Sequence, residues 1–254
     1  MRAELVLAED RRVAAKLMRH VGASTHVDNY NDHNAAKVRP GILARLQAGS
    51  AIALTSDAGT PLISDPGYKL VDEAMAVGVP VFAVPGPSAV TAALSVSGLP
   101  TDRFLFMGFP PPKQAQRRRW IEEVAGLRAT LVLYESPRRL PALLADLAQV
   151  LGDRPAAVAR ELTKLHEEVR RAGLAELSGH YQESGEPKGE IVVVIGWADT
   201  AASDAYDVEA RLAELLSRMP LRDAVDLVTA ESGRKRREVY TTALALKEDG
   251  GRSD

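Results

Sequence analysis

The sequence predicts an α/β protein with two lobes, a cleft between them and a small helical tail. Short apolar runs alternate with helical patterns through residue 199, as in α/β folds, and only helical patterns follow. The turn Gly98-Leu99-Pro100 separates two series of such units. We therefore expect an N-terminal lobe at 1–98, a C-terminal lobe at 99–199 and a helical tail at 200–254.

The long loop from Thr55 to Gly67 is the most informative stretch. It follows the apolar run 51–54, precedes a helical pattern from Tyr68, and holds two glycines, two prolines and two aspartates. Most βα connections have about 2–6 residues, and longer ordered loops are usually functional. The loop has neither the Gly-Lys-Ser/Thr end of a Walker motif nor Gly-x-Gly-x-x-Gly. It predicts a nucleotide-like ligand held by backbone and a carboxylate.

The remaining elements follow from apolar periodicity. In the first lobe we expect strands at 4–8, 51–54 and 79–84, and helices at 13–18, 42–46, 68–75 and 89–96. Residues 25–34 are polar and rich in turn formers, and Ser88 is placed to cap the last of these helices. In the second lobe we expect strands at 104–109, 130–134, 156–159 and 191–195, helices at 113–119 and 140–151, and a short helix or turn at 173–177.

The tail begins with a polar linker at 200–205. It continues as two amphipathic helices between 208 and 246, around Met219-Pro220. Helix–turn–helix is a weak interpretation of this pattern alone.

Composition excludes several classes of site. The chain has 254 residues, no cysteine and a formal net charge of −2, so thiolate chemistry and disulfides are excluded and global charge does not favour nucleic acid. The five histidines show no metal-binding spacing, so we expect no metal. No apolar run reaches the ~18 residues of a membrane helix. Met1-Arg2-Ala3-Glu4 opens no signal peptide, so we expect a cytoplasmic protein.

Basic clusters are the only residues that point to RNA. They are Lys113 with Arg117-Arg118-Arg119, the pair Arg138-Arg139, and the run 234–237. Most charge runs are solvated helix faces, but Arg138 and Arg139 follow a predicted strand and face the expected cleft. We predict that Arg138, Arg139, Lys113 and Arg117 bind RNA.

Four segments, in order along the chain, resemble one family. They are 56–67, Pro85-Gly86-Pro87-Ser88-Ala89, 134–139 (Tyr-Glu-Ser-Pro-Arg-Arg) and 160–164 (Arg-Glu-Leu-Thr-Lys). Together they resemble the ribosomal RNA small subunit methyltransferase I family of the tetrapyrrole methylase superfamily. Residues 8–12, 31–34 and 189–193, and the last helix, also fit. The match extends over nearly the whole chain, and the ordered set is highly specific.

The resemblance implies 2′-O-methylation of a cytidine ribose in the decoding centre of small-subunit ribosomal RNA. S-adenosylmethionine (SAM) would bind in the cleft, and the enzyme would be a homodimer. By position, the SAM contacts implied for the first lobe are Asp57, Gly59, Thr60, Ser88 and Ala89, and those for the second lobe are Met107, Tyr134, Arg160 and Leu162.

The chain departs from the family in two places. The family opens with a strand, a Pro-Ile-Gly-Asn-Leu-Gly-Asp turn and a helix, whereas this chain begins after them. We expect the lack of this unit to leave a sheet edge and apolar surface exposed. The second departure is Arg11, where the family usually has threonine.

Methyl transfer to a ribose hydroxyl needs a base or an oxyanion stabiliser. The candidate bases are Glu9, Asp10 and Glu161. His33 is a candidate by residue type, although a lone loop histidine is more often a surface residue. Lys164 would stabilise the oxyanion, lower the pKa of the hydroxyl or hold a phosphate. A structural ion pair between Arg160 and Glu161 is an equal alternative. We predict Glu9, Glu161 and Lys164 as catalytic.

Two other functions stay open. One is a methylase of the same superfamily that acts on a tetrapyrrole or a modified histidine, against which the 134–139 loop and the basic tail argue. The other is an inactive protein that binds SAM or the ribosome, which the missing opening unit motivates.

Overall fold

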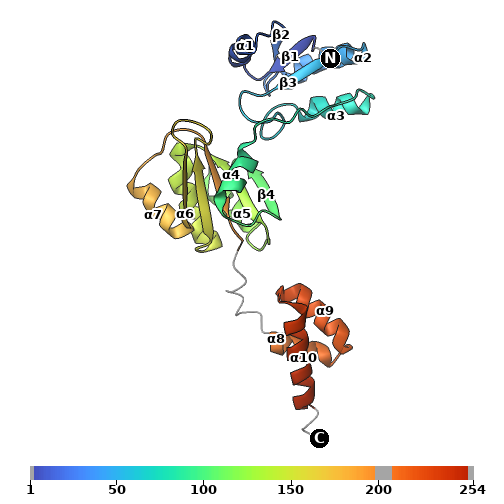
Figure 1. Cartoon of the computed structure of the whole chain (residues 1–254), viewed down its shortest axis with the longest axis vertical. Coiled ribbons are helices and arrows are strands. Elements are labelled where there is room, and N and C mark those ends of the chain that lie inside the picture. The colour runs from blue at the N-terminus through green and yellow to red at the C-terminus, as the bar shows by residue number, and fades with distance from the viewer. Residues whose placement is uncertain (1–2, 198–207, 251–254) are drawn as a thin grey trace. The chain divides into compact units, whose positions relative to one another are not determined.

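The computed structural model describes residues 3–197 and 208–250 (Figure 1). The chain divides into two compact units, Met1–Gly196 and Trp197–Asp254, which are described separately below. The predicted linker at 200–205 lies outside the described residues. The predicted lobe boundaries at 98 and 199 stay predictions.

The first sheet is a small parallel sheet of three strands. Its order is β2 (His26–Asn29), β1 (Leu5–Ala8), β3 (Ile52–Thr55), so β1 is central and all four of its residues are buried. The sheet is joined to the helices α1 (Arg11–His20), α2 (Ala35–Gln47) and α3 (Tyr68–Ala76). One core cluster unites strands and helices through Leu5, Leu7, Tyr30, Ile42 and Leu70.

The predicted strand at 79–84 is wrong, because these residues form no strand. Val81, Phe82 and Val84 are 47%, 82% and 87% exposed. A β-strand exists only where a neighbouring strand satisfies its backbone groups. Within the described residues β3 pairs on one side only, with β1, and nothing pairs with 79–84. This apolar segment has no pairing partner in the described part of the chain, and it therefore forms no strand and stays exposed.

The second sheet has five strands. Its order is β4 (Phe104–Gly108), β5 (Thr130–Glu135), β8 (Ile191–Ile195), β6 (Pro155–Arg160) and β7 (Glu168–Gly173). The β4–β5 pair is parallel and the other pairs are antiparallel. β8 lies in the centre and is buried throughout, as expected for an uninterrupted run of Ile and Val.

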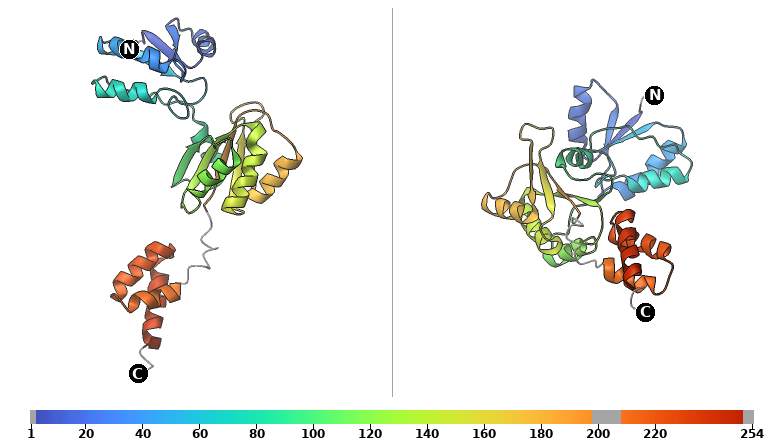
Figure 2. Two further views of the ribbon diagram at one scale, coloured as in Figure 1. Left: turned by 180° about the vertical axis from the view of Figure 1, so that it is seen from behind. Right: turned by 60° about the horizontal axis from the view of Figure 1, so that its bottom comes forward.

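Each face of this sheet is covered by helices (Figure 2). The larger core packs α5 (Gln114–Glu122), α6 (Leu140–Leu151) and α7 (Leu174–Glu183) on one face; the short 3₁₀ helix η1 (Pro137–Arg139) precedes α6. On the other face, α4 (Ala89–Ser97) packs on residues of β5, β6 and β8. We predicted α4 as part of the first lobe, but its core contacts are with the second sheet.

Two strands were absent from the prediction. β2 lies in the polar stretch 25–34, and β7 carries Arg170 and Arg171. Both are edge strands of their sheets, and neither is fully buried. Edge strands tolerate polar and charged residues, so their apolar signal is weak.

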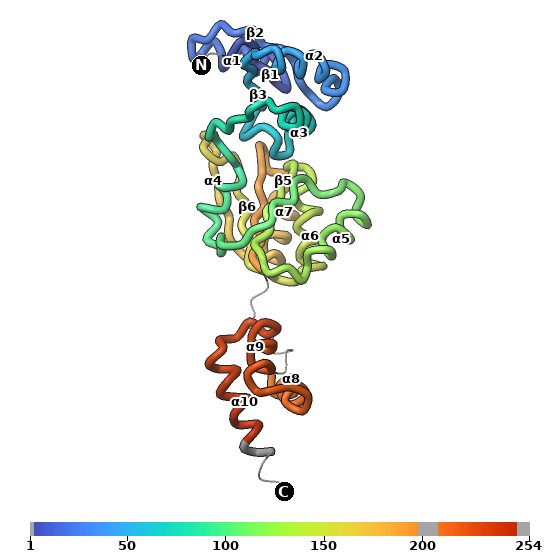
Figure 3. The backbone as a smooth tube through the Cα atoms, turned by 90° about the vertical axis from the view of Figure 1, so that its right-hand side faces the viewer, coloured from blue at the N-terminus to red at the C-terminus, as the bar shows by residue number. Residues whose placement is uncertain are grey.

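The second unit consists of α8 (Val208–Leu216), α9 (Leu221–Ser232) and α10 (Arg236–Gly250) around one small core (Figure 3). The prediction of two helices here is therefore wrong. Gly233 caps α9 in the left-handed conformation, with φ 66°, and separates it from α10. Among the described helices of the chain, none is long and apolar enough to cross a membrane.

The contrast between the exposed segment and the core is testable. Leu144 of α6 is fully buried, so Leu144→Ala should lower the free energy of unfolding by about 2–5 kcal/mol. Phe82→Ser should change it by less than about 0.5 kcal/mol, because Phe82 is already in solvent. Urea unfolding followed by circular dichroism measures both. A loss above ~1 kcal/mol for Phe82→Ser would show that the segment is packed.

Candidate functional site

Backbone strain is concentrated in two of the predicted loops. Among the described residues, every non-glycine residue with positive φ lies there: Leu62 and Ser64 in the long loop, and Glu161 and Thr163 in the loop after β6. Such conformations cost about 1–3 kcal/mol each, and they persist where the surroundings hold them. The long loop ends at Gly67, where a Cβ atom would lie 2.6 Å from Leu54 Cδ2. The φ of 139° at Gly67 also lies in the region that L-residues rarely adopt, so the position favours glycine.

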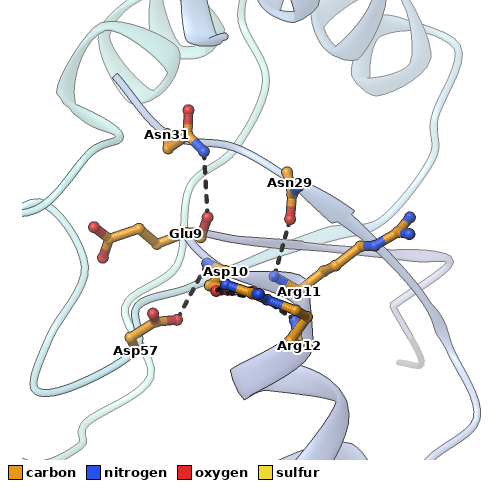
Figure 4. Close-up of polar contacts among 7 residues, drawn as sticks. All are labelled: Glu9, Asp10, Arg11, Arg12, Asn29, Asn31 and Asp57. Carbon is orange, nitrogen blue, oxygen red and sulfur yellow. Dashed lines mark hydrogen bonds and ion pairs between the residues drawn. The ribbon is translucent and has the colours of Figure 1, made fainter. Parts of the chain in front are cut away.

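The turn after β1 is tied to the same loop (Figure 4). The Asp10 amide donates to Asp57 Oδ1 at 3.2 Å, and Asn31 Nδ2 donates to the Glu9 carbonyl at 3.4 Å. The Arg11 amide donates to Asn29 Oδ1 at 2.9 Å. Because Arg11 makes this contact through its backbone, the contact does not depend on whether arginine or threonine stands there.

The two carboxylates of this turn have opposite environments. Asp10 is the N-cap of α1: it accepts from the Arg12 amide at 2.8 Å and pairs with the Arg12 guanidinium at 2.6 Å. These hydrogen bonds lower the pKa of Asp10 to about 2, which makes it a poor base. Burial, and then the nearby Asp65, Asp57 and Asp32, raise the pKa of Glu9. Its carboxylate has no hydrogen-bond partner among the described residues, and it points away from the Arg11 side chain (Figure 4).

The segment before α4 contacts the long loop. Thr60 Oγ1 donates to the Pro87 carbonyl at 2.8 Å. Ser88 occupies the N-cap position of α4, but its side chain makes no capping hydrogen bond, so our prediction of its cap was wrong. The Val90 amide, which such a cap would satisfy, lies near the Tyr134 phenol.

Tyr134 joins these loops to the second sheet. It lies on β5, and burial, followed by Asp65 and Glu190, raises the pKa of its phenol. Its ring centroid lies 4.8 Å from that of Phe106 and 5.4 Å from that of Phe109. Leu162 packs in the same apolar cluster. Met107 is half-buried and precedes Gly108, where a Cβ atom would lie 3.4 Å from Ser64 Oγ of the long loop.

The loop after β6 is held by an ion-pair network. Glu161 Oε1 accepts from Lys164 Nζ and from the Glu190 amide, each at 2.9 Å, and Lys164 Nζ also donates to Glu190 Oε2 at 2.9 Å. The hydrogen bond from Lys164 is the main cause that lowers the pKa of Glu161, and the same bond raises that of Lys164. The absence of a side chain at Gly189 leaves room for the Glu161 side chain, since a Cβ there would lie 2.3 Å from Glu161 Cγ.

The guanidinium of Arg160 also makes polar contacts within the fold. Its guanidinium pairs with Glu168 at 3.1 Å and donates to the Lys188 carbonyl at 3.2 Å. Its ion pair is thus with Glu168 across the β6–β7 ladder, rather than with Glu161. The sequence analysis did not predict that Gly189 and Glu190 would contact Glu161 and hold it in place. The signal available in the sequence was the Gly-Glu pair directly before the buried run 191–195.

The predicted RNA-binding residues separate into two groups. Arg117 is 4% exposed and its guanidinium pairs with buried Asp146 at 2.5 Å, so this side chain is engaged within the fold and its role in RNA binding stays a prediction. Arg139 donates to the Pro110 carbonyl and pairs with Glu135 at 3.1 Å. Arg138 and Lys113 are exposed and have no partner among the described residues. Only these two of the four are free to meet a phosphate.

The sequence comparisons define the class first. A family model described as Tetrapyrrole (Corrin/Porphyrin) Methylases matches residues 1–178. The chain is therefore a tetrapyrrole methylase by family. A second model, described as the RsmI C-terminal HTH domain, matches residues 202–247.

The curated relatives narrow the family. A ribosomal RNA small subunit methyltransferase I of Mesorhizobium japonicum is 44% identical over 99% of this chain and 86% of its own length. The protein of the same name from Erythrobacter litoralis is 46% identical over 97% and 87%. That of Pseudomonas aeruginosa is 42% identical over 94% and 87%. This chain belongs to the ribosomal RNA small subunit methyltransferase I family.

Solved structures share the fold at low identity. A diphthine synthase matches with a TM-score of 0.57 and 18% identity over 76% of this chain and 79% of its own. A uroporphyrin-III C-methyltransferase from Thermus thermophilus, complexed with S-adenyl homocysteine, matches with a TM-score of 0.50 and 21% identity over 76% and 85%. These likenesses establish the methylase fold alone.

The frame around Glu161 is testable with paired glycine variants. Gly189→Ala should displace the Glu161 carboxylate and lower the free energy of unfolding by more than the ~1–2 kcal/mol of a left-handed alanine. Gly185→Ala is the matched control: its φ is also positive, at 78°, but nothing lies within 4 Å of its Cβ position. Equal destabilisation of the two variants would refute the steric argument.

Proposed function

We propose that this chain transfers a methyl group from SAM to the 2′-hydroxyl of a cytidine ribose in the decoding centre of small-subunit ribosomal RNA. The observation that carries the proposal is the family: relatives more than 40% identical over nearly the whole chain bear the name ribosomal RNA small subunit methyltransferase I. Such a substrate would place the reaction in the cytoplasm. A homodimer is part of the proposal, through the resemblance of the sequence.

The charges of the site suit a cationic cofactor. Asp10, Asp32, Asp57 and Asp65 each raise the pKa of Glu9 by like-charge repulsion, which means that several carboxylates share one small region. The resulting negative potential favours a cation. SAM carries a sulfonium and an amino group, and its sulfonium supplies an activated methyl group for in-line transfer.

The residues proposed to hold SAM come from both sheets. Asp57, Gly59 and Thr60 lie in the long loop, where a Cβ at Gly59 would meet nothing within 4 Å, so a ligand can approach the backbone. Ser88 has a side chain free of any capping bond, and Ala89 begins α4. Met107, Tyr134 and Leu162 would supply apolar contacts from the second sheet. Arg160 would act through its backbone, because its guanidinium is already paired.

Glu9 is the better of the two proposed bases. A general base works best when its pKa lies near the working pH and its lone pairs are free. Glu9 meets both conditions better than Glu161, which is bonded to Lys164 and to the Glu190 amide. In the proposed step the 2′-oxygen bonds to the methyl carbon as the carbon–sulfur bond breaks, and the hydroxyl proton passes to Glu9. Lys164, charged and held by two carboxylates, would stabilise the developing oxyanion or hold a phosphate.

The decisive experiment is transfer of labelled methyl from SAM to small ribosomal subunits that lack the modification. We expect one methyl group per subunit, located on a cytidine 2′-oxygen by mapping of alkali-resistant positions. Subunits that already carry the modification are the control and should accept none. No transfer, with SAM binding retained, would leave the inactive SAM-binding protein as the explanation.

The base assignment has its own test. Glu9→Gln should lower kcat by about 10²- to 10⁴-fold and leave the Kd for SAM within a small factor, because only proton acceptance is lost. In the wild-type chain, activity should fall as pH drops through the pKa of Glu9, which is raised above 4.5, because the protonated carboxyl cannot accept a proton.

Asp32→Asn is the matched control for the pH dependence. It removes one of the charges that raise the pKa of Glu9, so the acid limb should move to lower pH while kcat at high pH is preserved. An unmoved acid limb in Asp32→Asn, or one that persists in Glu9→Gln, would contradict the role of Glu9.

A further inference from the structure

We infer that Phe109 is a stacking platform for a nucleobase of the RNA strand that presents the target ribose. The inference rests on the proposed function and extends it to substrate recognition. Sequence-specific binding of RNA usually uses unpaired bases that stack on aromatic side chains. A stacking residue would hold such an unpaired nucleotide and so orient its ribose toward the methyl donor.

Phe109 is exposed although its neighbours are not. Its side chain is 58% exposed, whereas Met107 and Gly108 are half-buried and Pro110 is buried. One side of the ring is held by Tyr134, at 5.4 Å between centroids and a tilt of 59°. Tyr134 is held in turn by Phe106 at 4.8 Å. The ring is therefore supported from within and offers surface to solvent.

The position of Phe109 relates it to the proposed SAM site. It directly follows Gly108, whose φ of 67° turns the chain at the end of β4 and which lies against Ser64 of the long loop. Its aromatic neighbour Tyr134 packs in the same apolar cluster as Val90 in the first turn of α4. A base on Phe109 would thus lie beside the residues proposed to hold the methyl donor.

The chain after Phe109 is rigid. Pro110-Pro111-Pro112 has restricted φ angles, and two arginines donate to its carbonyls: Arg139 to Pro110, and Arg117 to Pro112 at 3.3 Å. Arg117 is itself fixed by buried Asp146. A preorganised ring loses little freedom when a ligand stacks on it.

Free cations flank this segment. Lys113 lies four residues beyond Phe109, at most about 14 Å along the chain. Arg138 neighbours Arg139, whose guanidinium contacts Pro110. The side chains of Lys113 and Arg138 are both exposed, so they can contact phosphates of the RNA. The carboxylates around Glu9 would repel the same phosphates. A ring with free cations close to it along the chain fits a nucleotide better than an apolar partner.

The test measures methyl transfer to unmodified small subunits with Phe109→Ala, Phe109→Tyr and Phe104→Ala. Phe104 is 47% exposed at the other end of β4 and serves as the matched control. We expect Phe109→Ala to raise KM for the subunits by about 5- to 150-fold, the range of one base–aromatic stack, with an unchanged Kd for SAM. Phe109→Tyr should retain the wild-type KM, and so should Phe104→Ala.

A binding cycle identifies the stacked base. Single-stranded RNA of the target sequence, with an abasic nucleotide at successive positions, is titrated against the wild-type chain and Phe109→Ala. At one position the abasic substitution should weaken wild-type binding and leave the Phe109→Ala affinity unchanged, because the stack is already lost. Additive losses at every position would overturn the inference.

The remaining outcomes are also distinguishable. If the wild-type chain transfers no methyl group, the proposed function fails before the inference is tested by KM. If Phe109→Ala changes the sedimentation of the free protein, or weakens SAM binding, the ring serves a contact between copies or supports Tyr134, and the inference is wrong. If KM for Phe109→Ala equals that of Phe104→Ala, the ring has no role in recognition.

Discussion

The contact on which the site depends is the phenol of Tyr134. It lies near the Val90 backbone in the first turn of α4, near Asp65 of the long loop and near Glu190 just before β8, and its ring makes edge and tilted contacts with Phe106 and Phe109. Segments that are far apart in the sequence thus meet at one side chain. The strained residues Leu62 and Ser64 lie in the loop that carries Asp65, and their cost is offset by such tertiary contacts.

Environment gives the carboxylates of the site different roles. Asp10 and Glu161 are bonded to Arg12 and Lys164, which keeps them ionised and weakly basic. Glu9 has no such partner and lies among other carboxylates, so it holds a proton more strongly. Environments that push pKa values apart are a usual mark of acid–base assignment in enzymes. Residue type alone did not separate Glu9 from Glu161, because the distinction depends on neighbours in other loops.

The sequence predicted best where one segment determines its own structure. The run 191–195 and the helix 140–151 were predicted with their observed bounds, since their apolar pattern is unambiguous. Prediction failed where the structure of a segment depends on whether another segment pairs with it. The segment 79–84 has the composition of a strand but no neighbour to pair with, whereas Glu168–Gly173 is charged and becomes a strand through β6. The burial of Arg117 was likewise not evident from its own segment, because its ion-pair partner Asp146 lies on another helix.

Several arginines near the proposed site are already paired with carboxylates, which bears on how RNA would be recognised. Arg117, Arg139 and Arg160 are each bonded to a carboxylate of the fold, which leaves few free cations beside the proposed site. The net charge of −2 gives the chain no overall attraction for the RNA backbone. Recognition would then depend on contacts to an unpaired nucleotide, for which aromatic surface is well suited. The paired arginines still contribute, because they hold the proline segment that keeps Phe109 in place.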